Sequence, residues 1–358
     1  MNREVVVTGA GLVTAHGAGC DAFWDGLVAG TTPEAAPGAE GAGPLVPPDV
    51  APGRRDAMSW LRLAVAEALG PSGADGTGAV VLGAQARARP GTTHPLRAPE
   101  IVAVGRTGLE PVVVSHACAS GLFAIELGRR LVASGVHDRV LVGAATSLNA
   151  PATESLRVVR ALGGHPSRPF DVRRDGIRLG EGAGAVLLES SASAAARGAA
   201  VLARVAGSAA RIGGTSSAAS DAPTILGVMT DALRAAGATE VGHVHAHATG
   251  TVQGDGAELE ALSLLARATD SAVTATSHKG ALGHLLHASA FPGLVAALRS
   301  LATGIVPGSP GLARPEPAVG VLLPTAGTTT TPAGGVPSVL VNAFGFGGNN
   351  ASVLLERA

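Results

Sequence analysis

The sequence predicts an α/β fold made of two similar halves, and three observations carry this prediction. Short Val-rich runs closed by Gly or other small residues recur along the chain, as expected for strands buried on both faces. Helical stretches such as 121–134 separate these runs, and strands that alternate with helices are typical of α/β proteins. Motifs of the N-terminal half also return in modified form in the C-terminal half.

The strand candidates divide evenly between the two halves. In the first half they are 4–8, 79–83, 111–115, 139–143 and 184–188. In the second half they are 201–206, 241–247, 272–276, 338–342 and 351–355. Three stretches rich in Pro, Gly, Arg or Thr are predicted to be irregular, the first of them at the surface. They are 31–53, 84–100 and 307–337.

Two pairs of segments indicate an internal repeat. Residues 180–189 (GEGAGAVLLE) close the first half, and residues 345–356 (GFGGNNASVLLE) close the second. Residues 115–118 (SHAC) lead into a predicted helix, as do residues 277–280 (SHKG). We interpret the chain as a duplicated α/β unit, and chance similarity between Gly- and Ala-rich segments is the alternative. The halves would span 1–195 and 196–358.

Composition excludes several classes of protein. A hydrophobic fraction of 46% and a charged fraction of 15% exclude a disordered chain. A net charge of −1 provides no global field to attract nucleic acid or a membrane surface. Two cysteines are too few for a disulfide framework, which favours a reducing cytoplasm. No signal peptide is expected at the N-terminus, and no apolar run is long enough to predict a membrane helix.

Cys118 is the candidate nucleophile. A Val-rich strand, a turn of small residues and a helix surround it in that order, so its thiol should lie near a helix N-terminus. The helix dipole and free N–H groups there favour the reactive thiolate. The small neighbours also permit the tight turn of a nucleophile elbow. A buried, inert cysteine is the alternative, and Cys20 is interpreted as such a residue.

Histidines gather in the second half, where six of the eleven fall between 243 and 287. His243, His245 and His247 alternate along a predicted strand and should share one face. His284 follows Gly283 at the start of an apolar helix. Hydrogen-bonded core histidines and a metal site are the alternatives to catalysis. The spacing matches no zinc signature, so no metal is expected.

Two Gly-rich turns are candidate binding sites. The turn at 345–348 follows a predicted strand, and its backbone N–H groups could bind an anion or a developing oxyanion. Gly9 and Gly11 resemble the start of a dinucleotide fingerprint, but Thr14 stands where the third glycine is needed. No dinucleotide or other cofactor is therefore expected.

In chain order, these segments resemble the β-ketoacyl synthases, the condensing enzymes of the thiolase fold. The resemblance extends nearly end to end and predicts a thiolase-like, five-layer αβαβα arrangement of the two α/β halves. The motifs that carry it are 5–19, 117–121 (ACASG), 167–189, 245–262, 277–286 (SHKGALGHLL) and 342–356.

The resemblance implies a role for each matching residue. Cys118 would hold the acyl group as a thioester. His247 and His284 would hydrogen-bond the carbonyl of a malonyl thioester and assist its decarboxylation. Lys279, the only lysine in the chain, would organise the cleft. The N–H groups of Cys118 and Phe346 would form an oxyanion hole, with Phe346 as gating aromatic. Further residues around the site would be Asp255, Glu258, Thr249, Thr251 and Phe344.

The sequence departs from the family pattern at several positions. Ala248 replaces the usual Gly after the first catalytic His, and its methyl could shift the turn. Gly293 stands where a Glu often accompanies the Lys, so Lys279 should lack that ion pair. His287 replaces a small residue, and Pro292 should kink the helix that carries it. The stretches 82–111 and 213–223 are also short.

The leading functional hypothesis is decarboxylative condensation of the acyl group on Cys118 with a malonyl thioester, in a polyketide or similar pathway. The thioesters would be carried on the phosphopantetheine of an acyl carrier protein. Alternatives are acyl transfer to an oxygen or nitrogen nucleophile, a structural role as partner of an active synthase, and a metal-binding protein. A homodimer or a heterodimer with a second ketosynthase-fold chain is expected. Arginines near 54–55, 86–88 or 129–130 could receive the acidic carrier.

Overall fold

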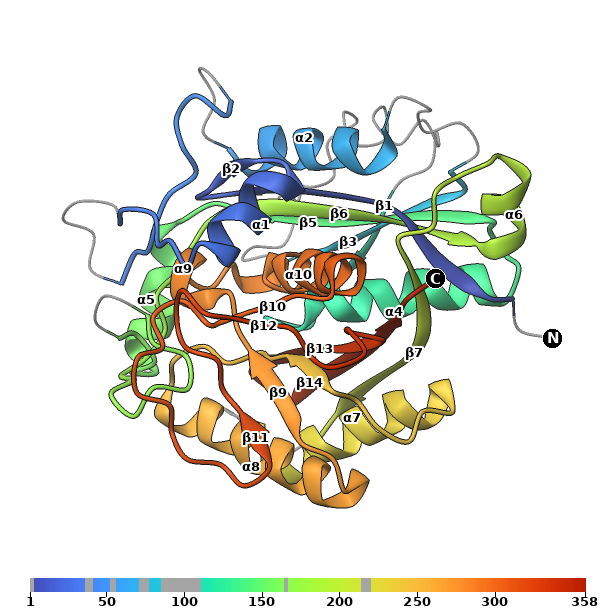
Figure 1. The fold of residues 1–358 in the computed structure, drawn as a ribbon. Coiled ribbons are helices and arrows are strands. Elements are labelled where there is room, and N and C mark those ends of the chain that lie inside the picture. The colour runs from blue at the N-terminus through green and yellow to red at the C-terminus, as the bar shows by residue number, and fades with distance from the viewer. Residues whose placement is uncertain are drawn as a thin grey trace.

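One continuous main sheet folds over so that its two halves stack, and helices between and outside these halves give the molecule five layers (Figure 1). The two halves, called the first and second sheets below, are joined where β1 (Val5–Thr14) pairs with β7 (Ala203–Ile212). The fold is that of a computed structural model, and the predicted thiolase-like α/β arrangement is confirmed. The described residues are 3–35, 41–51, 56–70, 77–84, 111–163, 167–213 and 220–358.

The first sheet has the spatial order β4-β3-β5-β6-β1. β3, β4 and β5 run parallel, whereas β6 is antiparallel to both β5 and β1. The inner strand β6, between β5 and β1, is buried along its whole length, as its apolar sequence predicts. The strands are β1 (Val5–Thr14), β3 (Ala79–Gly83), β4 (Val112–Val114), β5 (Arg139–Thr146) and β6 (Gly182–Ser190).

The second sheet repeats the topology of the first, with the order β9-β8-β13-β14-β7 and β11 (Val321–Leu322) added beyond β9. β8, β9 and β13 are parallel, and β14 is antiparallel to both β13 and β7. Each half therefore places its strands, counted along the chain, in the order 3-2-4-5-1. The strands are β7 (Ala203–Ile212), β8 (His243–His245), β9 (Val273–Thr276), β13 (Ser338–Gly345) and β14 (Asn349–Glu356).

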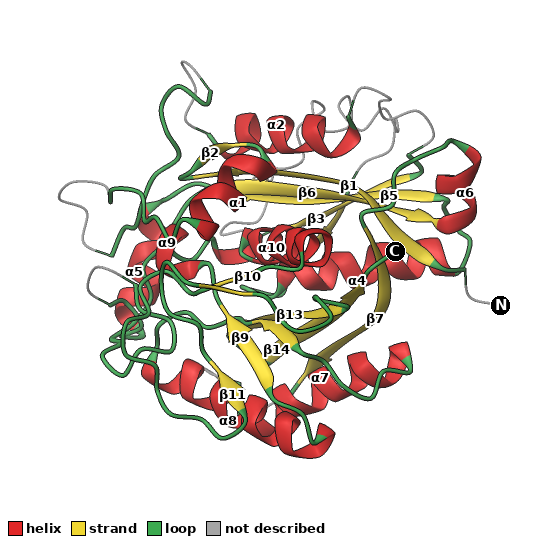
Figure 2. Cartoon of the chain, in the orientation of Figure 1, coloured by secondary structure: helices red, strands yellow, loops and turns green. Residues whose placement is uncertain are grey.

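Helices form the other three layers (Figures 1 and 2). α2 (Ala57–Leu69) covers the outside of the first sheet, and α7 (Ala222–Ala236) and α8 (Val252–Thr269) cover the outside of the second. α4 (Ser120–Ala133) and α10 (Ala290–Thr303) lie between the sheets. α10 is apolar and buried around most of its circumference, as a helix in the middle layer must be.

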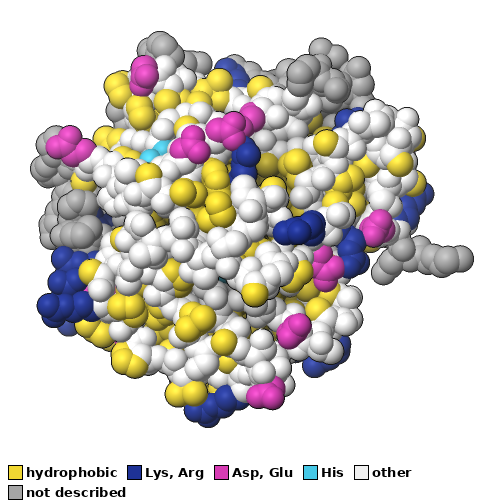
Figure 3. Space-filling view, in the orientation of Figure 1, with side chains coloured by type: hydrophobic (Ala, Val, Ile, Leu, Met, Phe, Trp, Pro, Cys, Tyr) yellow, Lys and Arg dark blue, Asp and Glu magenta, His cyan; other side chains and the backbone are white. Residues whose placement is uncertain are grey.

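Short elements complete the fold. They are β2 (Gly17–Ala18), α1 (Cys20–Val28), α5 (Ala150–Val158), α6 (Ser191–Ala196), α9 (Lys279–Leu282), the 3₁₀ turn η2 (Leu286–Ala288), β10 (Val306–Pro307) and β12 (Thr329–Thr330). None of the described helices combines the length and the apolar character needed to cross a bilayer. Acidic and basic side chains both occur on the face drawn in Figure 3, consistent with the near-zero net charge.

All ten predicted strands are present, but several local expectations were wrong. β7 runs to Ile212 rather than to residue 206. β1 continues to Thr14, and β8 ends at His245 rather than at residue 247. The surface loop expected over 31–53 is buried between 41 and 44, where the Gly43 N–H donates to the Leu179 carbonyl at 2.6 Å. Residues 85–110, which contain most of two expected irregular or shortened stretches, lie outside the described residues.

The expected kink at Pro292 is also absent. His287 lies in η2, and α10 begins afterwards at Ala290, so Pro292 falls in the first turn of that helix. A backbone N–H is not needed there, because the first turn has no preceding carbonyl to receive it. Proline therefore fits at this position without breaking the helix.

Candidate active site

A cavity of about 540 Å³ brings Cys118, His247 and His284 together. This volume is in the usual range for small-molecule sites. Cys118 follows β4 of the first sheet, whereas His247 follows β8 and His284 follows α9 in the second half. Residues that are distant in sequence, from both stacked halves, therefore meet at this cavity. The other cavity-lining residues from the sequence prediction are Thr249, Thr251, Phe344 and Phe346.

A strained turn presents Cys118. Ala117 has a φ of 48°, in the left-handed region that residues with a Cβ rarely adopt. Ser120, the first residue of α4, braces this turn: its Oγ accepts from the His116 N–H at 2.8 Å and donates to the Ala117 carbonyl at 2.6 Å. Burial raises the pKa of the Cys118 thiol to about 11, against the opposing effect of the Lys279 charge.

The Gly-rich turn after β13 lies directly against the cysteine turn. A Cβ at Gly345 would be only 2.9 Å from the backbone nitrogen of Cys118, so only glycine allows this approach. Asn349 ties the two turns together, because its Oδ1 is 2.9 Å from His116 Nδ1 and its Nδ2 donates to the Phe346 carbonyl at 2.7 Å. Phe346 itself is 39% exposed at the cavity.

His284 is buried with one ring nitrogen available. Its Nδ1 lies 2.7 Å from Ser289 Oγ, and that oxygen also accepts from the Leu285 N–H at 3.1 Å. A Ser289 hydroxyl that donates to Nδ1 satisfies both contacts and places the imidazole proton on Nε2. His284 Nε2 has no hydrogen-bond partner among the described residues, so it is free to bind a ligand in the cavity.

His247 lies beside His284, with ring centroids 5.5 Å apart and ring planes at 84°. Phe344 packs against the other side of His247 at 5.4 Å. Burial, followed by the charge of Lys279, holds the pKa of both imidazoles well below the ordinary value. Both histidines are therefore neutral near pH 7, and each can donate one hydrogen bond without carrying charge.

Lys279 lies behind the cavity rather than in it, and its ammonium donates to the His247 carbonyl. The described residues include no ion pair with this lysine, in keeping with the glycine at position 293. Burial lowers the pKa of Lys279 to about 8, although the nearby Glu258 and Asp255 oppose the change. The ammonium is thus held chiefly by a backbone oxygen.

The carboxylates of α8 hold the backbone that carries His247. Glu258 accepts from the N–H groups of His247 and Ala248 at 2.9 and 2.8 Å, and Asn342 donates to it at 3.0 Å. Both polar backbone groups of Ala248 are paired, because Ser277 Oγ donates to its carbonyl at 3.0 Å. The turn therefore keeps its hydrogen bonds with alanine in place of glycine.

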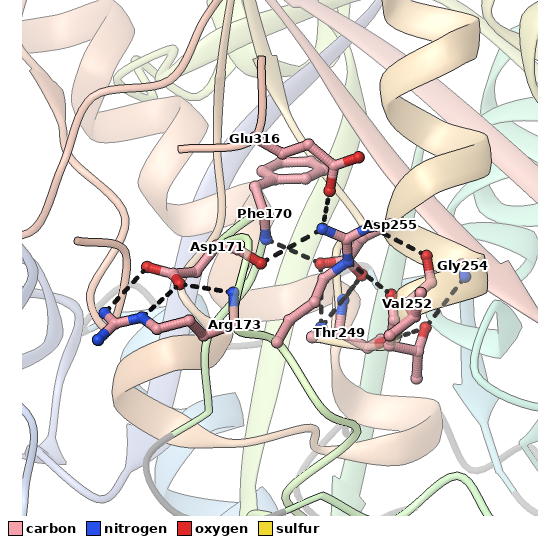
Figure 4. A network of polar contacts seen from close by, with 11 residues as sticks. Phe170, Asp171, Arg173, Thr249, Val252, Gly254, Asp255 and Glu316 are labelled. Atoms are coloured by element: carbon pink, nitrogen blue, oxygen red, sulfur yellow. Dashed lines mark hydrogen bonds and ion pairs between the residues drawn. The ribbon is translucent and has the colours of Figure 1, made fainter. Parts of the chain in front are cut away.

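Asp255 organises the following turn (Figure 4). Its carboxylate accepts from the N–H groups of Thr249 and Phe170 at 2.9 and 2.8 Å, and also from Gly250. Burial raises its pKa to about 6. Arg174 approaches the same turn from the first half and donates to the carbonyls of Thr251 and Val252 at 3.2 and 3.1 Å. Thr251 caps the N-terminus of α8 through the Gly254 N–H.

Several expectations about the site need correction. His243 and His245 are buried in the core and do not line the cavity, and the strand predicted to carry all three histidines ends before His247. Arg129 and Arg130 of α4 both pair with Glu126, and Arg129 is also bonded to Ser208, so this pair is not a free docking patch. The arginines at 54–55 and 86–88 lie outside the described residues.

Sequence reasoning missed four residues that support the site: Ser289, Asn342, Asn349 and Arg174. Each acts through a partner that is distant in sequence or concealed in a turn, so neither periodicity nor a motif indicates it. The one available signal was the position of Ser289, five residues after His284 at the start of an apolar helix. No three described His, Cys, Asp or Glu side chains converge as a metal site would require.

Comparison with known proteins places these features in a family. Residues 103–194 match the model of the β-ketoacyl synthase N-terminal domain, and residues 202–313 match that of the C-terminal domain. The 3-oxoacyl-[acyl-carrier-protein] synthase 2 of Vibrio cholerae is 34% identical over 260 residues, which cover 69% of this chain and 62% of the relative. The chain matches between 54% and 62% of the length of the first curated relatives.

Solved structures agree with the family models. A β-ketoacyl synthase from Burkholderia phymatum superposes with a TM-score of 0.82 at 26% identity, and both chains are covered in full. The ishigamide ketosynthase/chain length factor gives a TM-score of 0.85 at 25% identity, again over the whole of both chains. On the evidence of the two adjoining family domains and this shared fold, the chain belongs to the β-ketoacyl synthase family.

Proposed function

We propose that this protein catalyses decarboxylative condensation of an acyl group, held on Cys118, with a malonyl thioester. The observation that carries the proposal is the meeting of one thiol and two neutral imidazoles in a single cavity. The relatives named 3-oxoacyl-[acyl-carrier-protein] synthase support this reaction. The acyl and malonyl groups would arrive on the phosphopantetheine of an acyl carrier protein, and the residues require no other cofactor for the steps below.

In the first step, the sulfur of Cys118 attacks the carbonyl carbon of the incoming acyl thioester. A carbon–sulfur bond forms to Cys118, the bond to the carrier breaks, and the carrier thiol leaves with the proton of the cysteine. The N–H groups of Cys118 and Phe346 would stabilise the oxyanion, and the close approach of Gly345 to the Cys118 nitrogen supports this role. A pKa of about 11 keeps the Cys118 thiol mostly protonated at neutral pH, and a thiol is a weaker nucleophile than a thiolate. Stabilisation of the oxyanion therefore matters for this step.

In the second step, the malonyl thioester loses carbon dioxide. The electron pair of the broken carbon–carbon bond forms an enolate, whose oxygen would accept hydrogen bonds from His284 Nε2 and from His247. The carbanion carbon then attacks the carbonyl carbon of the acyl thioester on Cys118, and a carbon–carbon bond forms. The carbon–sulfur bond to Cys118 breaks, and the cysteine leaves as a thiolate that takes a proton from water. Neutral imidazoles suit this role, since they donate to the developing negative charge and do not repel Lys279.

We propose that the carrier protein docks around the mouth of the cavity. Val159, Val252 and Phe346 line it and are 53%, 65% and 39% exposed, and Arg160 beside them is also exposed. An apolar rim with a cation fits an acidic carrier. A solved neighbour is described as a type II polyketide ketosynthase in complex with its acyl-carrier protein, which supports a carrier as partner.

A second ketosynthase-fold chain is the other proposed partner. β4 is the last described strand of its sheet, and Val112 on it is 48% exposed. An edge strand with an exposed apolar side chain is a natural place for another chain to pair. The neighbour described as a ketosynthase/chain length factor supports an assembly of two such chains.

Intact mass spectrometry tests the catalytic proposal. Wild-type protein incubated with acyl-loaded carrier should gain the mass of one acyl group, and the Cys118→Ala variant should not. Added malonyl-carrier protein should then release carbon dioxide and yield a β-ketoacyl product. An adduct without decarboxylation would favour acyl transfer to an oxygen or nitrogen nucleophile. The absence of any adduct would overturn both reactions.

A further inference from the structure

Two buried imidazoles form a pair behind the cavity. His245 ends β8, and His278 directly precedes α9. His245 Nε2 and His278 Nδ1 are 2.8 Å apart, and the rings are nearly parallel at 13°. Both residues are at most 2% exposed, and neither lines the cavity. The proposed reaction therefore gives this pair no direct contact with substrate.

Filling the core with this pair is unfavourable, because it leaves polar atoms unpaired. His245 Nδ1 and His278 Nε2 are buried without a hydrogen-bond partner among the described residues. In a neutral pair one ring donates to the other, so one outer nitrogen keeps an unpaired N–H and the other an unpaired lone pair. A buried donor or acceptor left unpaired destabilises the folded state, and two apolar side chains of similar size would avoid this loss. Packing alone does not explain the choice of residues.

Helix α10 leaves room for the pair. A Cβ at Gly293 would be 2.9 Å from His245 Cδ2 and 3.3 Å from Val341 Cγ1. Any side chain at position 293 would therefore push the His245 ring away from its present place. The imidazole occupies the space into which a longer residue of α10 would otherwise extend.

The pair joins the two segments that carry the candidate catalytic groups. His245 lies two residues before His247, and His278 lies next to Lys279. The Lys279 ammonium crosses between the same segments to the His247 carbonyl, and Ser277 crosses to the Ala248 carbonyl. The titratable groups whose charge acts on Lys279 are Glu258 and Asp255 of α8, Cys118 before α4, and the imidazoles of His245, His247, His278 and His284.

We infer that His245 and His278 are positioning residues: their hydrogen bond fixes Lys279 against the His247 carbonyl and so orients the His247 imidazole in the cavity. This inference deepens the proposed function, and it rests on that function only for the effect on reaction rate. The hydrogen bonds that hold the two segments together are present in the protein without substrate.

A single lysine makes the inference directly measurable. Protein grown with lysine labelled with carbon-13 at Cε has one labelled side chain, Lys279. In the wild type its resonance should titrate with a midpoint of about 8. His245→Met keeps the volume but removes the hydrogen bond, so the ammonium should lose its fixed acceptor and a polar neighbour. Both losses disfavour the charged form, and the midpoint should fall.

Two variants separate positioning from packing. His245→Gln places an amide near the former Nε2 position and should return the midpoint toward the wild-type value. His243→Met is the matched control, because His243 is equally buried on β8 but bonds Thr276 instead of His278. It should leave the titration unchanged. If His245→Met does not fold, His278→Leu and His278→Asn, which can replace Nδ1, make the same comparison.

Reaction rates provide the second readout. His245→Met should lower the rate of condensation about tenfold or more, the scale of a misplaced catalytic group, and lower acylation of Cys118 much less. Equal titrations of His245→Met and His243→Met would overturn the inference. Wild-type protein that shows the expected titration but no condensation would contradict the proposed function and leave the positioning role standing.

Discussion

Ser289 decides which proton His284 offers to the cavity. A hydroxyl that donates to Nδ1 leaves the imidazole proton on Nε2, the nitrogen without a partner in the described structure. Neither residue is charged, so the arrangement depends on hydrogen-bond geometry rather than on an ion pair. The imidazole is thereby prepared as a donor before any substrate is present.

Ser289→Ala should therefore reduce the decarboxylation rate about ten- to a hundredfold, because the tautomer of His284 is no longer fixed. The measurement is carbon dioxide release from malonyl-carrier protein, with acylation of Cys118 followed separately. Ser300→Ala is a suitable control, since Ser300 is fully buried in α10 and its hydroxyl has no partner among the described residues. A comparable loss in both variants would contradict the assigned role.

The buried ammonium of Lys279 destabilises the folded state. Its pKa of about 8 lies below the ordinary value, so the folded state disfavours the charged form. This free-energy penalty is fully present below pH 8 and disappears as the pH rises through the ordinary lysine pKa of about 10.4. Lys279→Met should therefore raise the free energy of unfolding by about 1–3 kcal/mol at pH 7, with a smaller gain at pH 10.

Urea unfolding at the two pH values measures this gain. Lys279→Arg is the control, because a guanidinium stays charged and brings no such relief. A methionine variant that is less stable than the wild type at pH 7 would show that the ammonium is adequately compensated.

The main site residues could be predicted from the sequence because each lies in a short, recognisable segment. Cys118, His247 and His284 all reach one cavity, as expected. The supporting contacts could not be predicted. The bond between His116 and Asn349 joins residues 233 positions apart, and the pair of His245 and His278 depends on space left by a glycine of a third element.

At the scale of elements, the end of β13 and the start of α4 form one unit. Their backbones approach so closely at Gly345 that a methyl group does not fit beside Cys118. This contact, rather than either segment alone, sets the place of the proposed oxyanion hole.

Gly345→Ala should destabilise the protein by about 1–3 kcal/mol, as overpacking does, and should slow acylation of Cys118. Thermal unfolding and the rate of acyl-adduct formation measure the two effects. Gly242→Ala is the matched control, because a Cβ there meets nothing within 4 Å. Unchanged acylation in Gly345→Ala would show that the two turns are independent.

The sequence predicted element types more accurately than element ends. Strand runs are marked by apolar residues, and all ten were located correctly. β8 nevertheless ends at His245, because the N–H groups of His247 and Ala248 donate to Glu258 instead of to a neighbouring strand. The buried course of 41–44 depends on pairing with Leu179, which local composition does not reveal.

At the scale of the whole molecule, the mouth of the cavity is the docking surface proposed for the carrier. Arg160→Glu should slow association with the acyl carrier protein about tenfold at low salt, and the difference should shrink as salt screens the charges. Stopped-flow binding at two ionic strengths measures this. Arg234→Glu on α7, whose side chain is 76% exposed away from the cavity lining, should change the rate little. Equal slowing in both variants would move the docking site elsewhere.

Because the two halves have the same strand order, equivalent positions in the two halves can carry different functional groups. Cys118 and Lys279 occupy nearly equivalent positions in the two halves, just after the third strand and at the N-terminus of a helix. In the proposed reaction, the position in the first half would hold the acyl group, and the position in the second half would supply the cation. A single α/β unit has one such position, whereas the duplicated chain has two, and each can carry a different chemical group.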